Sequence, residues 1–102
     1  MRHIQVRYLS TISQASIGLL GATKAYPVYF KTRVGIHTFG MKFPIDVLIL
    51  SDTFEIVRLK SDLVPNRIYL WPLRYVHVIE LPSGYVRKHS IDIGETITLR
   101  FS

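Results

Sequence analysis

Residues 46–60 read DVLILSDTFEIVRLK, which is the pattern of two β-strands joined by a short turn. The first segment, residues 46–51, is apolar and β-branched after its opening aspartate, which predicts a central strand buried on both faces. Residues 51–53 have the small, polar side chains typical of a turn. Residues 54–60 alternate in polarity along part of their length, so they are expected to complete a hairpin with the central strand.

Other segments carry strand patterns on both sides of this hairpin. Residues 3–8 alternate between polar and apolar side chains, which predicts a strand with one solvated face. Roughly seven or eight short strands are expected, with turn signals about every 8–12 residues, a spacing typical of small barrels and sandwiches. The predicted strands outside the hairpin are residues 3–8, 26–31, 34–38, 68–71, 75–81 and 96–101, and residues 61–67 are expected to form a loop.

Little helix is expected. Ser10 or Thr11 can cap a short helix that runs to residue 20, and Gly21 suits its left-handed C-terminal position. Residues 84–89 have room for one helical turn. The predicted fold class is mainly β: a small, mostly antiparallel, barrel-like domain with one short N-terminal helix, and a sandwich is the alternative architecture.

The composition indicates one folded domain over residues 1–102. This length is the usual size of a domain, and 48% hydrophobic with 20% charged residues excludes intrinsic disorder. The absence of cysteine excludes a disulfide scaffold, a thiolate zinc site, a cysteine nucleophile and an iron–sulfur cluster. Because no apolar run approaches about 18 residues, we expect no membrane span, and residues 1–21 lack the apolar core of a signal peptide. A cytoplasmic location is therefore expected.

Positive charge is concentrated in the first 45 residues. The formal net charge is +6, and the first acidic residue is Asp46. Such an excess fits a targeting peptide, a surface for nucleic acid or another polyanion, or ordinary solvated faces. The cations are single and dispersed, which favours solvated faces, because polyanion-binding surfaces usually cluster theirs. The basic residues before Asp46 are Arg2, Arg7, Lys24, Lys31, Arg33 and Lys42.

Residues 41–46, Met-Lys-Phe-Pro-Ile-Asp, form the most specific motif of the chain. Three other segments accompany it: GLLG at 18–21, IELPSG at 79–84 and IDIGE at 91–95. In these motifs, over residues 4–100, the chain resembles the DUF192 family of small prokaryotic proteins, which have no assigned activity. The resemblance implies a mostly β, barrel-like domain and makes the first strand part of it rather than a cleavable leader. His37 departs from the family pattern, in which many members carry Trp two residues nearer the methionine.

Polar and soft side chains near the buried strand are the first candidates for a site. An unpaired carboxylate at Asp46 would cost several kcal/mol, so it either accepts backbone N–H bonds from the loop at 40–44 or serves as a ligand or general base at a cleft. His37 and Met41 are a soft pair that could bind copper(I), but no third ligand stands at a recognisable spacing. We therefore predict no metal, no cofactor and no catalytic residue.

Two further candidates lie downstream. Trp71 stands in a predicted loop, where it either packs or offers its ring to a ligand. Glu80 could pair with Arg74 or Arg87, and as a catalytic acid it would need Asp46 as a second carboxylate. The candidate ligand-binding residues are His37, Thr38, Met41, Lys42, Asp46, Trp71, Arg74 and Glu80.

Three functions are compatible with these features. The first is a binding module whose loops at 35–46 and 65–75 border a cleft for a small ligand, anionic or carbohydrate-like, because aromatic and Pro-rich loops on a rigid scaffold are typical of such sites. The alternative is binding of nucleic acid or another polyanion through the basic N-terminal half. Least favoured is an enzyme that uses Asp46 with His37 or Glu80, because no catalytic constellation is visible.

Overall fold

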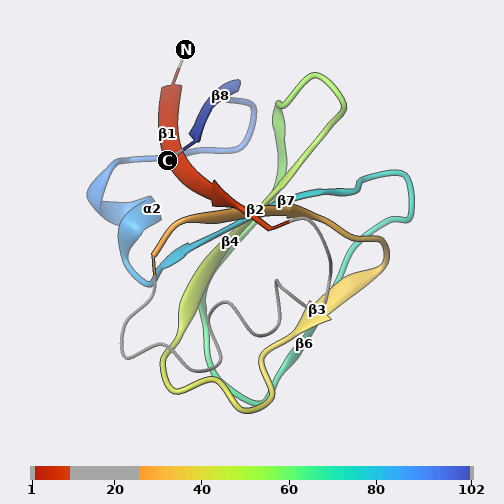
Figure 1. Ribbon diagram of the computed structural model, residues 1–102, viewed down its shortest axis with the longest axis vertical. Helices are drawn as coiled ribbons and strands as arrows, with labels where there is room; N and C mark the ends of the chain where they lie inside the picture. The colour runs from red at the N-terminus through yellow and green to blue at the C-terminus, as the bar shows by residue number, and fades with distance from the viewer. Residues whose placement is uncertain (1, 10–25, 102) are drawn as a thin grey trace.

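The computed structural model describes residues 2–9 and 26–101, and this part of the chain is mainly β (Figure 1). It contains eight strands and one short helix, in agreement with the predicted number of strands. In chain order they are β1 (Arg2–Tyr8), β2 (Val28–Lys31), β3 (Gly35–His37), β4 (Ile45–Leu50), β5 (Ile56–Leu63), β6 (Ile68–Leu70), β7 (His77–Pro82), α2 (Tyr85–Lys88) and β8 (Ile97–Phe101).

Six of the strands form one curled sheet, which is half of a barrel (Figure 1). The strand order is β5-β4-β7-β2-β1-β8. Neighbours from β5 to β2 are antiparallel, whereas β1 runs parallel to both β2 and β8. At one end the two edges approach each other, because an antiparallel bridge joins Glu55, next to β5, to Thr96, next to β8. The prediction of a mainly β domain is therefore confirmed, and the barrel is only half formed by this sheet.

The hairpin predicted at residues 46–60 lies in the body of this sheet. β4 lies between β5 and β7, and all six of its residues are buried. This burial is what an apolar, β-branched sequence predicts for a strand covered on both faces. β1 alternates as predicted, with Ile4 and Val6 buried and His3 and Gln5 exposed.

Side chains on the two faces of the sheet form two separate cores. The first core fills the inside of the curl, since it draws residues from both edges of the sheet and from α2. The second core lies on the other face. The first core comprises Ile4, Val6, Tyr29, Leu48, Leu50, Ile56, Ile79, Leu81, Val86, Ile91 and Ile97, and the second comprises Val28, Phe30, Ile45, Val47, Ile49, Leu63, Trp71 and Val78.

Strands β3 and β6 form a separate antiparallel ribbon that covers the second core (Figure 1). Ile36 and Tyr69, which pair across the ribbon, pack against that core. Gly35 pairs with Leu70, and a Cβ atom at position 35 would lie 2.4 Å from the carbonyl oxygen of Tyr69. Only glycine permits this close approach of the two backbones.

The prediction of one N-terminal helix is wrong for the described residues. There the helix is α2, a single turn in the C-terminal half, which matches the turn predicted over residues 84–89. The helix predicted at residues 10–20 lies outside the described residues. Isolated short helices are unstable in water, so α2 depends on tertiary contacts. Burial of Val86 in the first core supplies one of them.

Strand β5 is longer than predicted, because it continues to Leu63 through part of the predicted loop at 61–67. Its pairing with β4 shifts register between Ile45 and Val47, and Asp62 has a φ of 54°. Such a bulge adds a residue to one strand and redirects the side chains beyond it. Leu63 can therefore enter the second core although the polar residues before it interrupt the alternating pattern.

Candidate functional site

A groove opens between strand β8 and the turn that joins β4 to β5. Its volume is about 510 Å³, and its surface is mainly apolar, with carboxylate and hydroxyl groups among its lining residues. We call it the aromatic groove. Its described lining residues are Tyr29, Asp52, Thr53, Phe54, Ile97, Thr98, Leu99 and Phe101.

Aromatic rings gather around Tyr29 beside this groove. The centre of the Tyr29 ring lies 5.7 Å from Tyr8, 5.9 Å from Phe54, 6.0 Å from His77 and 6.2 Å from Phe101. These separations are typical of favourable aromatic pairs. Tyr29 itself is buried, whereas Tyr8 and Phe101 are more than half exposed. The cluster therefore exposes ring surface to solvent.

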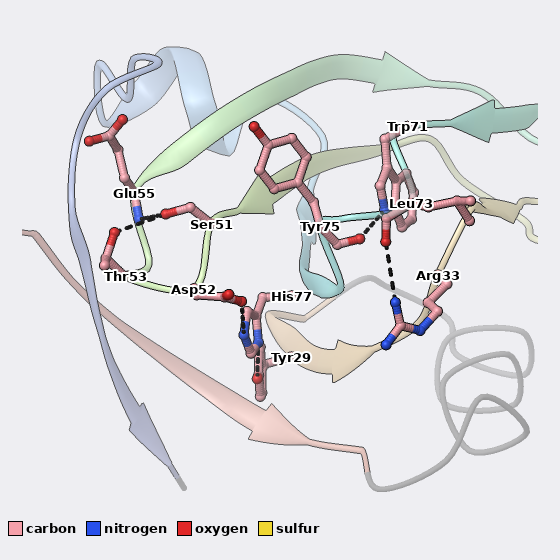
Figure 2. A network of polar contacts seen from close by, with 10 residues as sticks. All are labelled: Tyr29, Arg33, Ser51, Asp52, Thr53, Glu55, Trp71, Leu73, Tyr75 and His77. Atoms are coloured by element: carbon pink, nitrogen blue, oxygen red, sulfur yellow. Dashed lines mark hydrogen bonds and ion pairs between the residues drawn. The ribbon is translucent and has the colours of Figure 1, made fainter.

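A chain of polar contacts runs from Tyr29 to the rim of the groove (Figure 2). The Tyr29 hydroxyl lies 2.7 Å from Nδ1 of His77, and Nε2 of the same ring lies 3.7 Å from Oδ1 of Asp52. Three elements bring these residues together: β2, β7 and the turn between β4 and β5. Because the Asp52 side chain is 89% exposed, its carboxylate is accessible to a ligand.

Burial is the main influence on the pKa of both rings in this network, His77 and Tyr29. It lowers the pKa of His77, the Asp52 carboxylate opposes that shift, and Lys31 adds to it. Burial also raises the pKa of Tyr29, and the neighbouring Tyr8 raises it further. Both rings are therefore neutral at neutral pH. Because the Asp52 carboxylate can only accept, we assign the imidazole proton to Nε2, facing Asp52, and the Tyr29 hydroxyl as the donor to Nδ1.

This arrangement predicts the tautomer of His77. In NMR spectra of the ring nitrogens near neutral pH, we expect a protonated Nε2 and a bare Nδ1 at His77. In Tyr29→Phe, Nδ1 loses its donor, and we expect a mixture of tautomers together with a loss of about 1 kcal/mol in the free energy of unfolding. The exposed His89 is the reference ring in the same spectra. A protonated Nδ1 at His77 in the unaltered protein would contradict the assignment.

The turn between β4 and β5 holds the rim of the groove in place. Phe54 has a φ of 64°, which is unusual for an aromatic residue. Its N–H donates to the Ser51 carbonyl at 2.9 Å, and the Ser51 hydroxyl accepts the N–H of Glu55 at 3.1 Å (Figure 2). Such strain persists only where surrounding contacts hold it, and it clusters at functional sites.

The residues predicted from the sequence lie in separate regions. His37 is exposed on the ribbon, where its ring stacks on Phe39 at 5.1 Å. Thr38 is buried, and its hydroxyl donates to the Val64 carbonyl at 2.7 Å and accepts the N–H of Arg67 at 2.9 Å. Thr38 therefore ties together the segments that follow β3 and precede β6.

Of four further predicted residues, two belong to or pack against the second core and two are exposed like His37. Met41 and Trp71 contact the second core, and the Trp71 indole donates to the Tyr75 carbonyl at 2.8 Å (Figure 2). This contact closes the loop after β6, so the structure explains Trp71 by packing. Lys42 is exposed, and the exposed Arg74 guanidinium lies 4.9 Å from the centre of the Tyr75 ring.

Asp46 and Glu80 lie on opposite faces of the curled sheet. Asp46 pairs with Leu81, and the next residue, Val47, pairs with Glu80. Because successive strand residues point to opposite faces, Asp46 lies on the side of the first core and Glu80 on the side of the second. The two carboxyl groups therefore cannot act on one substrate. No ion pair joins Glu80 to an arginine among the described residues.

Each of these buried carboxyl groups has a defined environment. Asp46 accepts the N–H of Asp62 at 3.0 Å and the N–H of Val86 at 2.9 Å. Asp46 therefore accepts hydrogen bonds from backbone N–H groups, as one of the two predictions for it requires. The donors are Asp62 and Val86, and the prediction that they lie in the loop at 40–44 is wrong. Burial raises the pKa of Glu80 to about 8.

None of the eight predicted candidates appears among the described residues that line the aromatic groove. Of its polar lining residues, Asp52 and Thr53 belong to a segment whose composition indicates only a turn, and Thr98 lies on β8. Its aromatic members are spread over β2, β8 and that turn, with no common spacing. No local signal marks Phe101 either, because its 59% exposure at the end of β8 is evident only in the folded structure.

Two further features of residues 2–9 and 26–101 bear on function. No helix in this part of the chain is long and apolar enough to cross a bilayer. The same residues bring together no group of three His, Cys, Asp or Glu side chains that could hold a metal ion.

The chain is similar to proteins from archaea and bacteria. A UPF0127 protein of Pyrococcus furiosus is 27% identical over 100 residues, which cover 92% of this chain and 85% of that protein. Among solved structures, a Sinorhizobium meliloti protein whose name suggests a transcription regulator is 20% identical, with a TM-score of 0.76 over 87% of this chain and 76% of that chain. A Novosphingobium aromaticivorans protein of unknown function is 14% identical, with a TM-score of 0.76 over 87% and 70%.

At these identities the two solved structures show a shared fold only. The family comparison is stronger, because the model of DUF192, described as "Uncharacterized ACR", matches residues 1–99. This match confirms the resemblance that the motif at 41–46 indicates. The chain belongs to the DUF192 family.

Proposed function

We propose that this protein is a binding module whose aromatic groove takes a small, uncharged, carbohydrate-like ligand. The observation that carries the proposal is the groove itself, in which rings of Phe54 and Phe101 stand beside the carboxylate of Asp52 and the hydroxyl of Thr53. Its volume of about 510 Å³ is within the range typical of small-molecule sites.

The chemistry of the groove matches that of a sugar ring. The C–H faces of a sugar are apolar and pack on aromatic rings, whereas its hydroxyl groups need hydrogen-bond partners at the rim. The Asp52 carboxylate can accept more than one hydroxyl hydrogen bond, and Thr53 can donate or accept. The negative charge of Asp52 favours an uncharged ligand over an anionic one.

The groove lies apart from the cleft predicted between the loops at 35–46 and 65–75. Pairing of β3 with β6 does bring these loops together, but Thr38 joins them by direct hydrogen bonds. The exposed candidates His37, Lys42 and Arg74 belong to a different surface, which is formed by the ribbon.

The two arginines of β1 are engaged by neighbouring side chains. Arg2 forms an ion pair with Glu95 at 2.9 Å, at the start of β1. At the other end of the same strand, the Arg7 guanidinium lies 4.2 Å from the centre of the Tyr26 ring. Arg2 and Arg7 are thus engaged with other side chains, so β1 does not present the free basic surface that nucleic-acid binding needs.

The proposal predicts weak, groove-specific sugar binding. In an NMR titration of the full chain with common mono- and disaccharides, we expect saturable shifts at the amides of Thr53 and Phe101, with dissociation constants of about a millimolar, as is typical of small weak contacts. Phe101→Ala should weaken binding about five- to tenfold, because it removes one stacking ring.

The matched control is Ile93→Ala, which removes an exposed apolar side chain that is not among the described lining residues of the groove. It should leave the affinity unchanged. Absence of saturable shifts with every sugar, or equal affinity of Phe101→Ala and the unaltered protein, would reject the proposal.

A further inference from the structure

Exposed apolar side chains gather on the ribbon and its flanks. Nine large hydrophobic residues are conspicuously exposed in the described part of the chain, and six of them lie between positions 34 and 73. Ile68, Leu70 and Leu73 are the most exposed, at 61%, 64% and 62%. Isolated exposed residues need no explanation, but a contiguous apolar patch marks an interaction surface. The six are Val34, Phe39, Val64, Ile68, Leu70 and Leu73.

The geometry of the ribbon places several of these side chains on one side. Ile68 pairs with His37, and Leu70 pairs with Gly35, whereas the intervening Tyr69 packs on the second core. Since side chains alternate along a strand, Ile68 and Leu70 point away from that core. Phe39 stacks on the ring of His37, so it extends the same surface. We call this outward side the ribbon face.

The two segments that carry the ribbon face contain basic residues and no acidic ones, and the hollow that adjoins this face is lined by the acidic Asp62. Residues 31–45 and 64–76 contain no aspartate or glutamate. The charged residues of these two segments are Lys31, Arg33, Lys42, Arg67 and Arg74. No ion pair neutralises any of these cations among the described residues. The Arg33 guanidinium donates to the Leu73 carbonyl at 3.4 Å, which places this cation directly beside the apolar patch (Figure 2).

A hollow of about 280 Å³ adjoins the ribbon face between β5 and β6. Lys60 and Arg67 supply two cations to its lining, and Ile68 belongs both to the hollow and to the ribbon face. Asp62 also lines it, and its carboxylate accepts a hydrogen bond from the Ser83 hydroxyl, so the two cations and this carboxylate leave the described lining with one net positive charge. A phosphate-sized anion beside Lys60 and Arg67 would thus lie directly next to exposed apolar side chains.

We propose that the ribbon face docks on an anionic lipid bilayer. Ile68, Leu70 and Phe39 enter the interfacial region, while the surrounding cations contact lipid phosphates, one of them in the hollow next to β6. Apolar side chains bordered by Lys and Arg are the combination that binds negatively charged membrane surfaces. A second copy of the chain is a poor occupant, because two such faces carry charge of the same sign and repel.

The test is co-sedimentation of the full chain with vesicles. We expect binding to phosphatidylcholine vesicles that contain about 30 mol% phosphatidylserine or phosphatidylglycerol, and little binding to phosphatidylcholine alone, because each cation near an anionic surface strengthens binding about fivefold. Binding should fall as salt increases. The double variant Ile68→Ser with Leu70→Ser should weaken binding at least tenfold, and Arg74→Gln should weaken it about fivefold.

Matched controls change similar residues elsewhere. Ile93→Ser removes an exposed isoleucine, and Arg87→Gln removes an exposed cation on α2; both should bind like the unaltered protein. Circular dichroism checks that the double variant is folded, and Arg74→Gln alone tests the surface if it is not. Phe101→Ala, which tests the sugar site, should keep full vesicle binding, so the two proposals fail separately.

Three results would overturn the docking proposal. One is equal binding to vesicles with and without anionic lipid. Another is binding of inorganic phosphate without binding to vesicles, which would leave the hollow as a site for a free anion. The third is self-association that is lost in the Ile68→Ser with Leu70→Ser variant, which would assign the ribbon face to a second copy of the chain.

Discussion

Replacing Glu80 by glutamine is expected to raise the free energy of unfolding by about 3 kcal/mol at pH 7 and to remove most of its dependence on pH between about 5 and 8. Glu80 lies on β7 between Val28 of β2 and Val47 of β4, and it is buried. Burial in these apolar surroundings raises its pKa from 4.5 to about 8. The folded protein therefore keeps a proton on Glu80 at neutral pH, whereas the unfolded chain has released it.

The sign of the pH dependence follows from this difference in bound protons. Because the folded pKa lies above the unfolded value, the full stability is present below about pH 4.5. Stability is lost as the pH rises from 4.5 toward 8, and the loss levels off above about 8. At about 1.4 kcal/mol per pKa unit, the total loss is on the order of 4–5 kcal/mol, and roughly 3 of these have accumulated by pH 7.

Glutamine keeps the shape of Glu80 and cannot ionise. The stability that the unaltered protein loses as the pH rises is therefore not lost in Glu80→Gln. The measurement is urea unfolding of both proteins at several pH values between 5 and 9. Glu55→Gln, at an exposed position, is the control and should follow the unaltered protein at every pH. If the unaltered protein keeps constant stability from pH 5 to 8, or if Glu80→Gln declines in parallel with it, Glu80 does not carry the pH dependence.

Replacing Asp46 by asparagine is expected to lower the free energy of unfolding by about 2–4 kcal/mol. One carboxylate oxygen accepts the N–H of Asp62 at the bulge of β5, and the other accepts the N–H of Val86 in the first turn of α2. Asparagine has only one acceptor oxygen, so its NH₂ group must face one of these N–H donors. A buried donor then loses its partner.

The loss is large because Asp46 bonds to two elements, α2 and the bulge of β5. The first N–H groups of a helix have no partner within the helix, and Gly84, the N-cap of α2, has no side chain to supply one. At the bulge, Asp62 has a φ of 54°, a conformation that needs external contacts to persist. Asp46 therefore holds α2 and the end of β5 to the same strand.

Chemical denaturation measures this loss, and hydrogen exchange locates it. In Asp46→Asn we expect the amides of Asp62 and Val86 to exchange faster than those of the central strands. The control is Asp52→Asn, which changes an exposed aspartate and should alter stability by less than about 0.5 kcal/mol. Unchanged stability in Asp46→Asn would mean that a single oxygen satisfies both donors.

Much of the sheet was predictable from local sequence. The alternation along β1 and the continuous apolar run of β4 specify one half-buried and one fully buried strand, and both predictions are confirmed. These patterns are readable because side chains alternate with a period of two, whatever the strand pairs with. The bulge at Asp62 was not predictable, because its polar residues look like the start of a loop.

The aromatic groove was not predictable from the sequence, but the environment of one predicted candidate was predictable in part. Asp46 was correctly identified as a carboxylate that must have partners, because burying an unpaired charge is costly. Its donors, at Asp62 and Val86, are 16 and 40 residues away in the chain, so no local pattern could name them. The groove around Phe101 went unpredicted for the same reason.

Local patterning was thus sufficient for the class of fold, the buried centre of the sheet and membership of the DUF192 family, since periodicity and short motifs are properties of neighbouring residues. The excess of positive charge was also visible there, but not its arrangement around the ribbon. Long-range pairing decides the rest. It curls the sheet until Glu55 meets Thr96, and it sets the register that directs Asp46 and Glu80 to opposite cores. It also places the aromatic groove beside β8. The physical reason is that a strand's own sequence specifies which side chains share a face, whereas its partners and register decide what that face meets.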